Sequence, residues 1–321
     1  MPVHLRPILL TSAFILLLCA CSSKPKTASN TTPTPMTIPS PQVSTLLKPG
    51  VFSATQMPTD KCLIGTTNTI DVQDPQGDLV SWSPVENTIA YVAPSAGSAW
   101  SWYEGDLVTI SNLSAVKTFT VSNGGVFGDI SWSPDGKTIA FIARRFGDNT
   151  FTAMTLQTDT GQLTDLFPDK EAHTDSLTSP KGIVNWIDNT DLVIATSCDG
   201  DCAQLIKVNT LNGSKAAYGT GTIRKKDDHS LDITNLQPTT IPTSYPTMTD
   251  PNWAPNSNNE LIYFDENGNA QFISGSSTPA PLGFGYYRNG EIKWSYDSQF
   301  VAIRTDDNLY IYKAGCLNNQ K

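Results

Sequence analysis

The chain has few of the residues on which enzymes and nucleic-acid-binding proteins depend. It contains 3 His in 321 residues, and its 21 Lys and Arg are outnumbered by 30 Asp and Glu, which gives a formal net charge of −9. The short basic run Arg224–Lys226 is followed at once by Asp227 and Asp228. A protein that binds nucleic acid or an anionic membrane face needs a positive surface. The composition therefore argues against both kinds of partner.

Catalytic and cofactor-binding motifs are also missing from the sequence. It has no Gly-x-Ser-x-Gly nucleophile elbow, and the stretch Gly283–Tyr287 lacks the lysine of a phosphate-binding loop. His173 and His229 lie in polar segments, where we interpret them as solvated loop residues. We expect no catalytic residue, no cofactor and no metal. The alternative is calcium held by Asp199 and Asp201, although a calcium loop usually supplies more carboxylates.

No apolar run is long enough to span a bilayer comfortably. The run Ile8–Leu18 suits the apolar region of a signal peptide. It leads into Leu18-Cys19-Ala20-Cys21, which resembles the bacterial lipobox except for Cys19. We predict that residues 1–20 are a lipoprotein signal peptide and that Cys21 is acylated, with an ordinary secretory signal as the alternative. The protein is then extracytoplasmic and attached to a membrane through its lipid anchor only, in the outer membrane and periplasm or at the cell surface.

The segment after Cys21 has almost no large apolar residues. Ser22–Gln42 is rich in Ser, Thr and Pro, so it cannot bury enough surface to fold. We interpret residues 21–47 as the acylated cysteine with a disordered tether, and residues 48–321 as the folded domain. A recognition peptide is the alternative, because Pro-rich segments also dock in aromatic grooves.

Besides the acylated Cys21, four cysteines remain after the signal peptide, and an even number in an exported chain favours disulfides. Cys198 and Cys202 enclose a short loop that one bridge would close. Cys62 and Cys316 would then pair near the two ends of the folded region. A four-cysteine zinc site is the alternative, but the spacing fits it poorly.

An internal repeat is the strongest feature of the sequence. Its clearest copy is Asp129–Ala143, with the sequence DISWSPDGKTIAFIA, and Asp78–Val92 is a second. Weaker copies begin at Ile183, Pro251 and Glu291. The five copies are marked by Trp82, Trp132, Trp186, Trp253 and Trp294.

Each repeat predicts a short antiparallel unit. A first strand ends in Trp, and Ser-Pro-Asp-Gly predicts a tight turn in which Asp135 bonds to the local backbone and Gly136 adopts a positive φ. An alternating strand follows, then a third such as Asp106–Ile110 or Asn308–Tyr312, and a poorer fourth such as Lys117–Val121. Four short strands every 40 to 50 residues are typical of a propeller blade. We predict an all-β fold, a β-propeller.

The Trp-Ser-Pro-Asp-Gly-Lys-x-Ile-Ala-Phe core resembles the WD40-like β-propeller repeat of the TolB family, also found in the propellers of prolyl-oligopeptidase-type enzymes. The resemblance covers about Cys62 to Cys316, and a β-sandwich is the alternative. Five blades are led by a Trp, while Tyr218–Asp250 is either a long insertion or part of a sixth. We expect a strand within Leu63–Val72 to complete the last blade, with Cys62 bridged to Cys316 across this closure.

Loops between the second and third strands carry the candidate binding residues. The first loop contains Trp100, Trp102 and Tyr103, and the second contains Arg144 and Arg145. Aromatic and Arg side chains on rigidly mounted loops are the usual binding hot spots. We predict that Trp102, Tyr103, Arg144 and Arg145 bind a ligand or partner, whereas Trp100 more often would cap its own blade.

The sequence favours a binding or scaffold module for an envelope protein or a cell-wall glycan. TolB-like proteins bind envelope partners, but this chain has a tether where they have an N-terminal domain. The alternative is a carbohydrate-active hydrolase that uses carboxylates in the propeller funnel. A third interpretation is a structural lid on an envelope complex, without a pocket of its own.

Overall fold

The computed structural model describes thirteen stretches of the chain. They are residues 62–69, 77–95, 105–146, 150–168, 179–198, 201–225, 231–237, 252–255, 260–264, 269–274, 279–285, 291–304 and 308–317. All of them belong to the second of two compact units, Ser40–Lys321. The predicted signal peptide, Cys21, and the tether through residue 47 lie outside the described residues.

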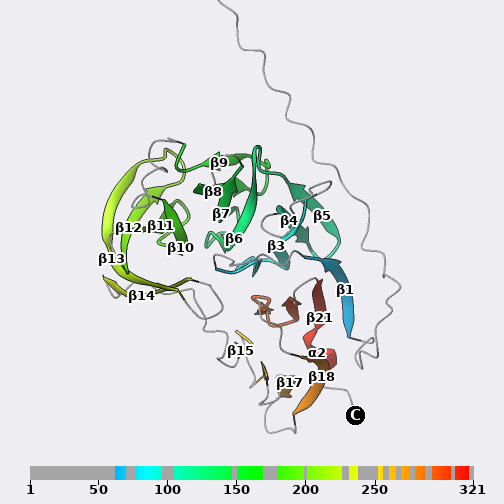
Figure 1. The fold of residues 1–321 in the computed structure, drawn as a ribbon. Helices are drawn as coiled ribbons and strands as arrows, with labels where there is room; N and C mark the ends of the chain where they lie inside the picture. The colour runs from blue at the N-terminus through cyan, green and yellow to red at the C-terminus, as the bar shows by residue number, and fades with distance from the viewer. Residues whose placement is uncertain are drawn as a thin grey trace, which may run out of the picture. The chain divides into compact units, whose positions relative to one another are not determined.

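Antiparallel sheets make up nearly all of the described chain, as predicted (Figure 1). Each sheet is named here by its first strand. The β2 sheet contains β2 (Val80–Trp82), β3 (Thr88–Pro94), β4 (Gly105–Ser111) and β5 (Ala115–Phe119). The β6 sheet contains β6 (Gly124–Trp132), β7 (Thr138–Arg145), β8 (Phe151–Gln157) and β9 (Leu163–Asp165). A single residue pair, Gly105 with Val126, joins these two into one eight-stranded sheet.

The remaining strands form three further sheets. The β10 sheet contains β10 (Pro180–Trp186), β11 (Asp191–Ser197), β12 (Cys202–Asn209), β13 (Lys215–Lys225) and β14 (Leu231–Gln237). The β15 sheet contains β15 (Asn252–Trp253), β16 (Glu260–Phe264), β17 (Asn269–Ser274) and β18 (Ala280–Gly285). The β19 sheet contains β19 (Glu291–Trp294), β20 (Phe300–Arg304), β21 (Asn308–Lys313) and β1 (Leu63–Asn68). The short helix α2 (Ala314–Leu317) follows β21.

Each of the five sheets begins with a strand that ends at or next to a repeat tryptophan, so the repeat sets the sheet boundaries. The predicted third strands lie within β4 and β21. The segment that the sequence left open contributes β13 and β14 to the β10 sheet, which therefore has five strands. Among the described residues, this part of the chain extends an existing sheet and starts no new one.

The turn after Trp132 has the predicted chemistry. Asp135 Oδ1 accepts hydrogen bonds from Ser133 Oγ at 2.7 Å and from the Lys137 amide at 3.1 Å. Gly136 has φ of +69°, and its amide donates to Ser133 O at 2.9 Å. The side chain of Asp135 thus replaces backbone acceptors inside the turn.

The turn after Trp294 repeats this arrangement with a different sequence. Asp297 Oδ1 accepts from Ser295 Oγ at 2.7 Å and from the Gln299 amide at 3.0 Å. Here the positive φ of +59° falls on Ser298, where Gly136 stands in the other turn. Retention of the aspartate therefore preserves the turn even where the glycine is lost.

Buried tryptophans join successive sheets through their indole N–H groups. Trp82 Nε1 donates to Lys293 O at 2.9 Å, Trp132 Nε1 to Ser81 O at 3.2 Å, and Trp186 Nε1 to Ser131 O at 3.3 Å. Each acceptor is the residue immediately before the tryptophan of the neighbouring sheet. The same end of the first strand is therefore adjacent in the β10, β6, β2 and β19 sheets.

The N-terminal strand completes the last sheet, as the sequence predicted. β1 pairs antiparallel with β21, from Leu63 opposite Tyr312 to Asn68 opposite Asn308. Figure 1 shows the two strands side by side, at opposite ends of the colour scale. The predicted Cys62–Cys316 disulfide is present and lies at the start of this ladder.

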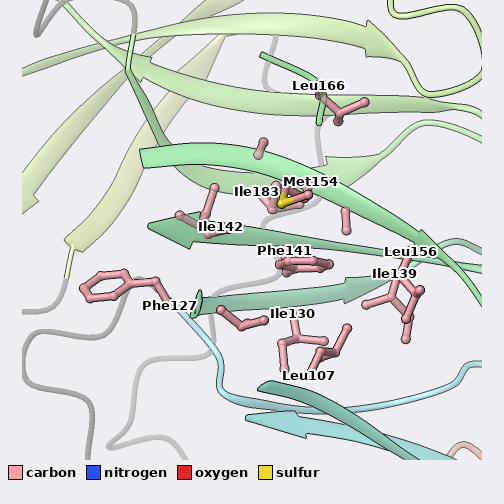
Figure 2. Packing of buried hydrophobic residues seen from close by; sticks show 14 of the residues in the cluster. Leu107, Phe127, Ile130, Ile139, Phe141, Ile142, Met154, Leu156, Leu166 and Ile183 are labelled. Atoms are coloured by element: carbon pink, nitrogen blue, oxygen red, sulfur yellow. The ribbon is translucent and has the colours of Figure 1, made fainter. Parts of the chain in front are cut away.

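The largest apolar core lies between the β2, β6 and β10 sheets. Figure 2 shows Phe141 of β7 surrounded by aliphatic side chains, with Leu107 on one side and Ile183 on the other. Phe141, Leu107 and Ile183 are fully buried. Burial of each such side chain is worth about 1.5–3 kcal/mol. The core therefore fixes β6, the strand that carries Asp129.

Candidate functional site

A buried carboxylate connects the last sheet to the first. Glu291 is the first residue of β19, and its side chain is 8% exposed. The Leu79 amide donates to Oε1 at 3.0 Å and to Oε2 at 3.1 Å, and the Val80 amide donates to Oε2 at 3.1 Å. β2 is an edge strand, and the amides of an edge strand need acceptors outside the ladder. Glu291 supplies them from the neighbouring sheet.

Asp129 has the same role between the β6 and β10 sheets. Its Oδ2 accepts a hydrogen bond from the Ile183 amide of β10. Asp129 has φ of +57°, and the β6 ladder changes register around Gly128, so the strand bulges where the side chain turns toward β10. A Cβ atom added to Gly77 would lie 2.3 Å from Asp129 Oδ1. Only glycine leaves room for this carboxylate.

These two acids occupy equivalent positions, since each lies three residues before its tryptophan. The sequence carries the signal in the copies Asp129-Ile-Ser-Trp132 and Glu291-Ile-Lys-Trp294. The sequence analysis did not identify either residue as a functional group. The alternation of side chains along a strand does not predict that an acid at this position accepts a hydrogen bond from the neighbouring sheet.

Further charged groups surround Glu291. Arg304 of β20 is 1% exposed, and its Nη1 lies 3.4 Å from Glu291 Oε1. Lys293 Nζ lies 2.7 Å from Asp78 Oδ2. We call Asp78, Asp129, Glu291, Lys293 and Arg304 the charged cluster; β6, β19, β20 and the segment before β2 contribute its residues.

Burial and neighbouring charges shift the pKa values in this cluster. Burial raises the pKa of Glu291 to about 7, against the opposing effect of Arg304. Burial lowers the pKa of Lys293, but Asp78 and Glu291 raise it by more, so Lys293 is charged at neutral pH. Glu291 is thus a carboxyl group that titrates near neutrality, held by backbone amides and an arginine.

The cluster can hold sheets together and can bind or release a proton. Its carboxylates accept hydrogen bonds from backbone amides or pair with cationic side chains, so much of their acceptor capacity serves contacts within the protein. Among the described residues, no group of three or more His, Cys, Asp and Glu is arranged to hold a metal ion.

Two of the predicted binding residues, Arg144 and Arg145, lie at the end of β7. The other two, Trp102 and Tyr103, lie outside the described residues, as does Trp100. Arg145 forms an ion pair with Asp165 of the same sheet and donates to Phe167 O at 2.8 Å. Its side chain is 16% exposed. Arg144 is half-buried and stands opposite Gly125 and Phe151 in the ladder.

The next residue, Phe146, is the most exposed aromatic side chain among the described residues, at 54%. It is the first residue after β7, next to Arg145 in the sequence. The sequence analysis missed Phe146, although an aromatic residue beside two arginines is a hot-spot combination. At this loop the structure presents Phe146 to solvent and fixes Arg145 in place.

The predicted Cys198–Cys202 disulfide is present and closes the end of the β11–β12 hairpin. The Cys198 amide donates to Cys202 O at 3.3 Å, which continues the ladder beyond Ser197 and Ala203. Asp201 is exposed, and Asp199 lies outside the described residues. Within those residues no helix has the length and hydropathy that a membrane crossing requires.

No family model matches the chain, and no curated protein matches it. Among solved structures, TolB from Acinetobacter baumannii is similar at 13% identity, over 74% of this chain and 55% of that chain, with a TM-score of 0.36. A putative TolB from Agrobacterium tumefaciens is similar at 12% identity, over 74% and 89%, with a TM-score of 0.39.

Another solved structure, oligogalacturonate lyase from Vibrio parahaemolyticus, is similar at 11% identity, over 85% of this chain and 98% of that chain, with a TM-score of 0.49. The matched solved structures thus include TolB proteins and lyases at low identity. Their activities are not transferred to this chain.

Proposed function

We propose that this protein is an extracytoplasmic binding module: a five-bladed β-propeller, held at a membrane by acylation of Cys21, that binds an envelope protein or a cell-wall component. The observation that carries the proposal is the use of the buried acids Glu291 and Asp129 as links between sheets. Carboxylates engaged in this way hold the scaffold and leave the loops free to provide recognition.

The five-bladed arrangement is supported by the repeated contact between sheets. Trp186 and Trp132 each donate to the residue before the preceding repeat tryptophan, and Trp82 donates to the residue before Trp294, which joins the β2 sheet to the β19 sheet. The β15 sheet packs against the β19 sheet through Phe272 and Trp294, whose ring centroids are 6.5 Å apart. A ring of five such sheets would bury both faces of each sheet and would pair its two chain ends through β1.

Export of the chain is supported by its disulfides. Both bridges join the cysteine pairs predicted from the sequence, and disulfides persist mainly in oxidising compartments outside the cytosol. Acylation of Cys21 is tested by metabolic labelling with a fatty-acid analogue. We expect label in the wild type and none in Cys21→Ala, whereas equal labelling of both would exclude this anchor.

A carbohydrate-active hydrolase is the second candidate, favoured by the concentration of Asp78, Asp129 and Glu291 within one cluster. A glycosidase needs one protonated and one ionised carboxyl group on either side of the scissile bond. Glu291 has the protonation behaviour of such an acid. Its bonds to two backbone amides weigh against this role, since a substrate would have to displace them.

In-cell photo-crosslinking tests the binding role directly. A photoreactive residue would replace Trp102 in one variant and Phe146 in a second. A third variant with the photoreactive residue at Val85 is the matched control, because Val85 is 48% exposed in the turn after Trp82. We expect one dominant envelope-protein adduct from the first two sites and none from Val85. Adducts of equal yield from all three sites would indicate nonspecific contact.

Absence of a protein adduct at positions 102 and 146, with expression and membrane attachment confirmed, would exclude a protein partner in contact with these two residues. Hydrolysis assays on cell-wall glycans with Glu291→Gln as the comparison would then test the second candidate. Activity that depends on Glu291 would overturn the binding role.

A further inference from the structure

Six large apolar side chains are exposed among the described residues, and four of them lie in turns at one end of the sheets. Three are in turns that follow a repeat tryptophan, and one is in the turn between β12 and β13: Val85, Ile187, Tyr296 and Leu211. Their exposed fractions range from 40% for Tyr296 to 74% for Leu211. Single exposed apolar residues are common, but several on one face indicate an interaction surface.

The direction of the strands places these turns at the same end. In an antiparallel sheet, the turn after the first strand and the turn after the third strand lie at one end. The Thr210 amide donates to Thr190 O at 2.8 Å, so the turns of Leu211 and Ile187 are in contact. We call the described turns at this end the turn face: residues 83–87, 112–114, 133–137, 158–162, 187–190, 210–214 and 295–299.

Contacts between neighbouring sheets bring these turns together. A Cβ atom added to Gly136 would lie 2.5 Å from Val85 Cγ2, so Val85 packs on the next turn. On the other side, Asn87 Nδ2 donates to Asp297 Oδ2 at 3.0 Å, which joins the turns of the β2 and β19 sheets. The tryptophan bonds bring the β10 sheet to the same end. The exposed apolar residues therefore belong to one continuous surface.

The exposed charges of the turn face balance, although the chain as a whole has a net charge of −9. On these turns and the residues that border them, three acids and three lysines are exposed: Glu86, Asp159, Asp188, Lys137, Lys215 and Lys313. The half-buried Asp135 and Asp297 accept hydrogen bonds within their own turns. A surface of this kind neither attracts an anionic partner nor repels a neutral one. Apolar side chains among balanced charges fit a zwitterionic lipid surface.

The chain also enters the described domain at this end. Cys62 precedes β1, and its carbonyl oxygen accepts a hydrogen bond at 2.9 Å from the amide of Lys313, the last residue of β21. Lys313 lies at the turn end of β21, because it pairs with the first residue of β20. The chain that leads from Cys21 therefore joins the domain at the turn face. Phe146 lies at the opposite end of β7.

We propose that the turn face rests on a membrane surface, with its four exposed apolar side chains among the lipid headgroups. This inference rests on the proposed acylation of Cys21 and adds a second lipid contact to that anchor. Apolar side chains in such contacts lie about 5–10 Å deep, at the boundary between headgroups and acyl chains. The end of the domain that carries Phe146 then points away from the membrane, toward the partner.

Quenching by lipid tests this orientation. The acylated protein would be reconstituted in phosphatidylcholine vesicles that contain a lipid with a quencher at the headgroup boundary. A fluorescent amino acid would replace Leu211 in one variant and Phe146 in another, since both side chains are exposed. We expect quenching to be about threefold stronger at position 211 than at position 146. Equal quenching at the two positions, or stronger quenching at 146, would overturn the proposal.

A second experiment tests whether the apolar side chains make the contact. The fluorescent residue would replace Val85, and its quenching would be measured with and without the two changes Leu211→Ser and Ile187→Ser. We expect these changes together to reduce quenching roughly twofold, because binding scales with the apolar area that enters the lipid. Phe146→Ser is the matched control and should leave quenching unchanged. Unchanged quenching in the double variant would contradict the proposed contact.

Fatty-acid labelling of the same preparation separates this inference from the proposed anchor. Labelled protein with equal quenching at positions 211 and 146 would overturn the orientation and leave the anchor intact. Absence of label would overturn the anchor and this inference with it. A dominant protein adduct from a photoreactive residue at Val85 would assign the turn face to a protein partner and exclude the lipid contact.

Discussion

Two junctions of this protein rely on a carboxylate three residues before a tryptophan, but they join very different distances along the chain. Asp129 reaches Ile183 across 54 residues, whereas Glu291 reaches Leu79 across 212. For a flexible chain this difference adds only about 1.2 kcal/mol of closure entropy. The β2 and β19 sheets are nevertheless also joined by a side-chain bond between their turns, and the β19 sheet itself is completed by the β1–β21 ladder and the Cys62–Cys316 disulfide. The junction at Glu291 joins the first and last repeats of the chain, and β1, which belongs to the β19 sheet, is the strand that precedes β2 in the sequence.

Removal of the Cys62–Cys316 disulfide should have the largest effect. In the chain-entropy account, the bridge over 254 residues of Cys62–Cys316 stabilises by about 5 kcal/mol, and the bridge over 4 residues of Cys198–Cys202 by about 2 kcal/mol. Urea unfolding of the two Cys→Ser double variants measures the difference. An equal loss in both would show that β1 is held on β21 by its other contacts and that the Cys62–Cys316 disulfide adds little to this pairing.

Gly77→Ala should disturb the Asp129 junction next most strongly. The added Cβ would overlap Asp129 Oδ1, and Gly77 has φ of +68°. We expect a loss of about 2–4 kcal/mol. Gly213→Ala is the matched control, because Gly213 has φ of +71° but open space around it, so it should lose only about 1 kcal/mol. Similar losses in a urea titration would mean that Asp129 can move away.

Asp129→Ala should have a smaller effect, because it leaves the Ile183 amide without this acceptor. A buried donor left unsatisfied costs about 1–3 kcal/mol. Asp129→Asn retains an acceptor oxygen and should restore most of the loss in the same unfolding experiment. If Asp129→Ala and Asp129→Asn lost the same free energy of unfolding, the charge of Asp129 would matter more than its hydrogen bond to the Ile183 amide.

The smallest expected effect concerns Asp297, which accepts a hydrogen bond from Asn87 in the turn after Trp82. Burial raises its pKa, but the bonds from Ser295, the Gln299 amide and Asn87 lower it by more, so its pKa lies below the usual value. Its stabilising contribution is therefore present above the pKa of the unfolded chain and is lost as the pH falls through the folded value. Asp297→Asn should reduce the acid sensitivity of the unfolding temperature below about pH 4 and leave the unfolding temperature between pH 5 and 8 unchanged.

The sequence predicted the architecture well where a local pattern determines it. The Trp-Ser-Pro-Asp-Gly motif predicted the turn of Asp135, and the incomplete last repeat predicted that β1 would pair with β21. The extension of the β10 sheet by β13 and β14 was left open, because strand content alone does not show which sheet a strand joins.

The charged cluster could not be predicted in the same way. Glu291 and Asp129 precede apolar strand residues and look like ordinary solvent-facing positions of an alternating pattern. Their role depends on amides of another sheet, 212 and 54 residues away. The sequence also could not predict that Arg145, one of the proposed binding residues, forms an ion pair within the protein. Its partner Asp165 lies on β9, opposite Met154 of β8, and no local pattern links the two residues.

The position of Cys62 has a mechanical consequence. Cys62 is the last residue before β1, and its bridge leads to Cys316 in the helix that follows β21. A pull on the chain ahead of Cys62 would therefore be transmitted through a covalent bond into the C-terminal end of the sheet, before any pair of the β1–β21 ladder carries load. The ladder would be protected from being peeled apart one hydrogen bond at a time. A domain tethered in this way could resist drag at a cell surface without a stronger fold.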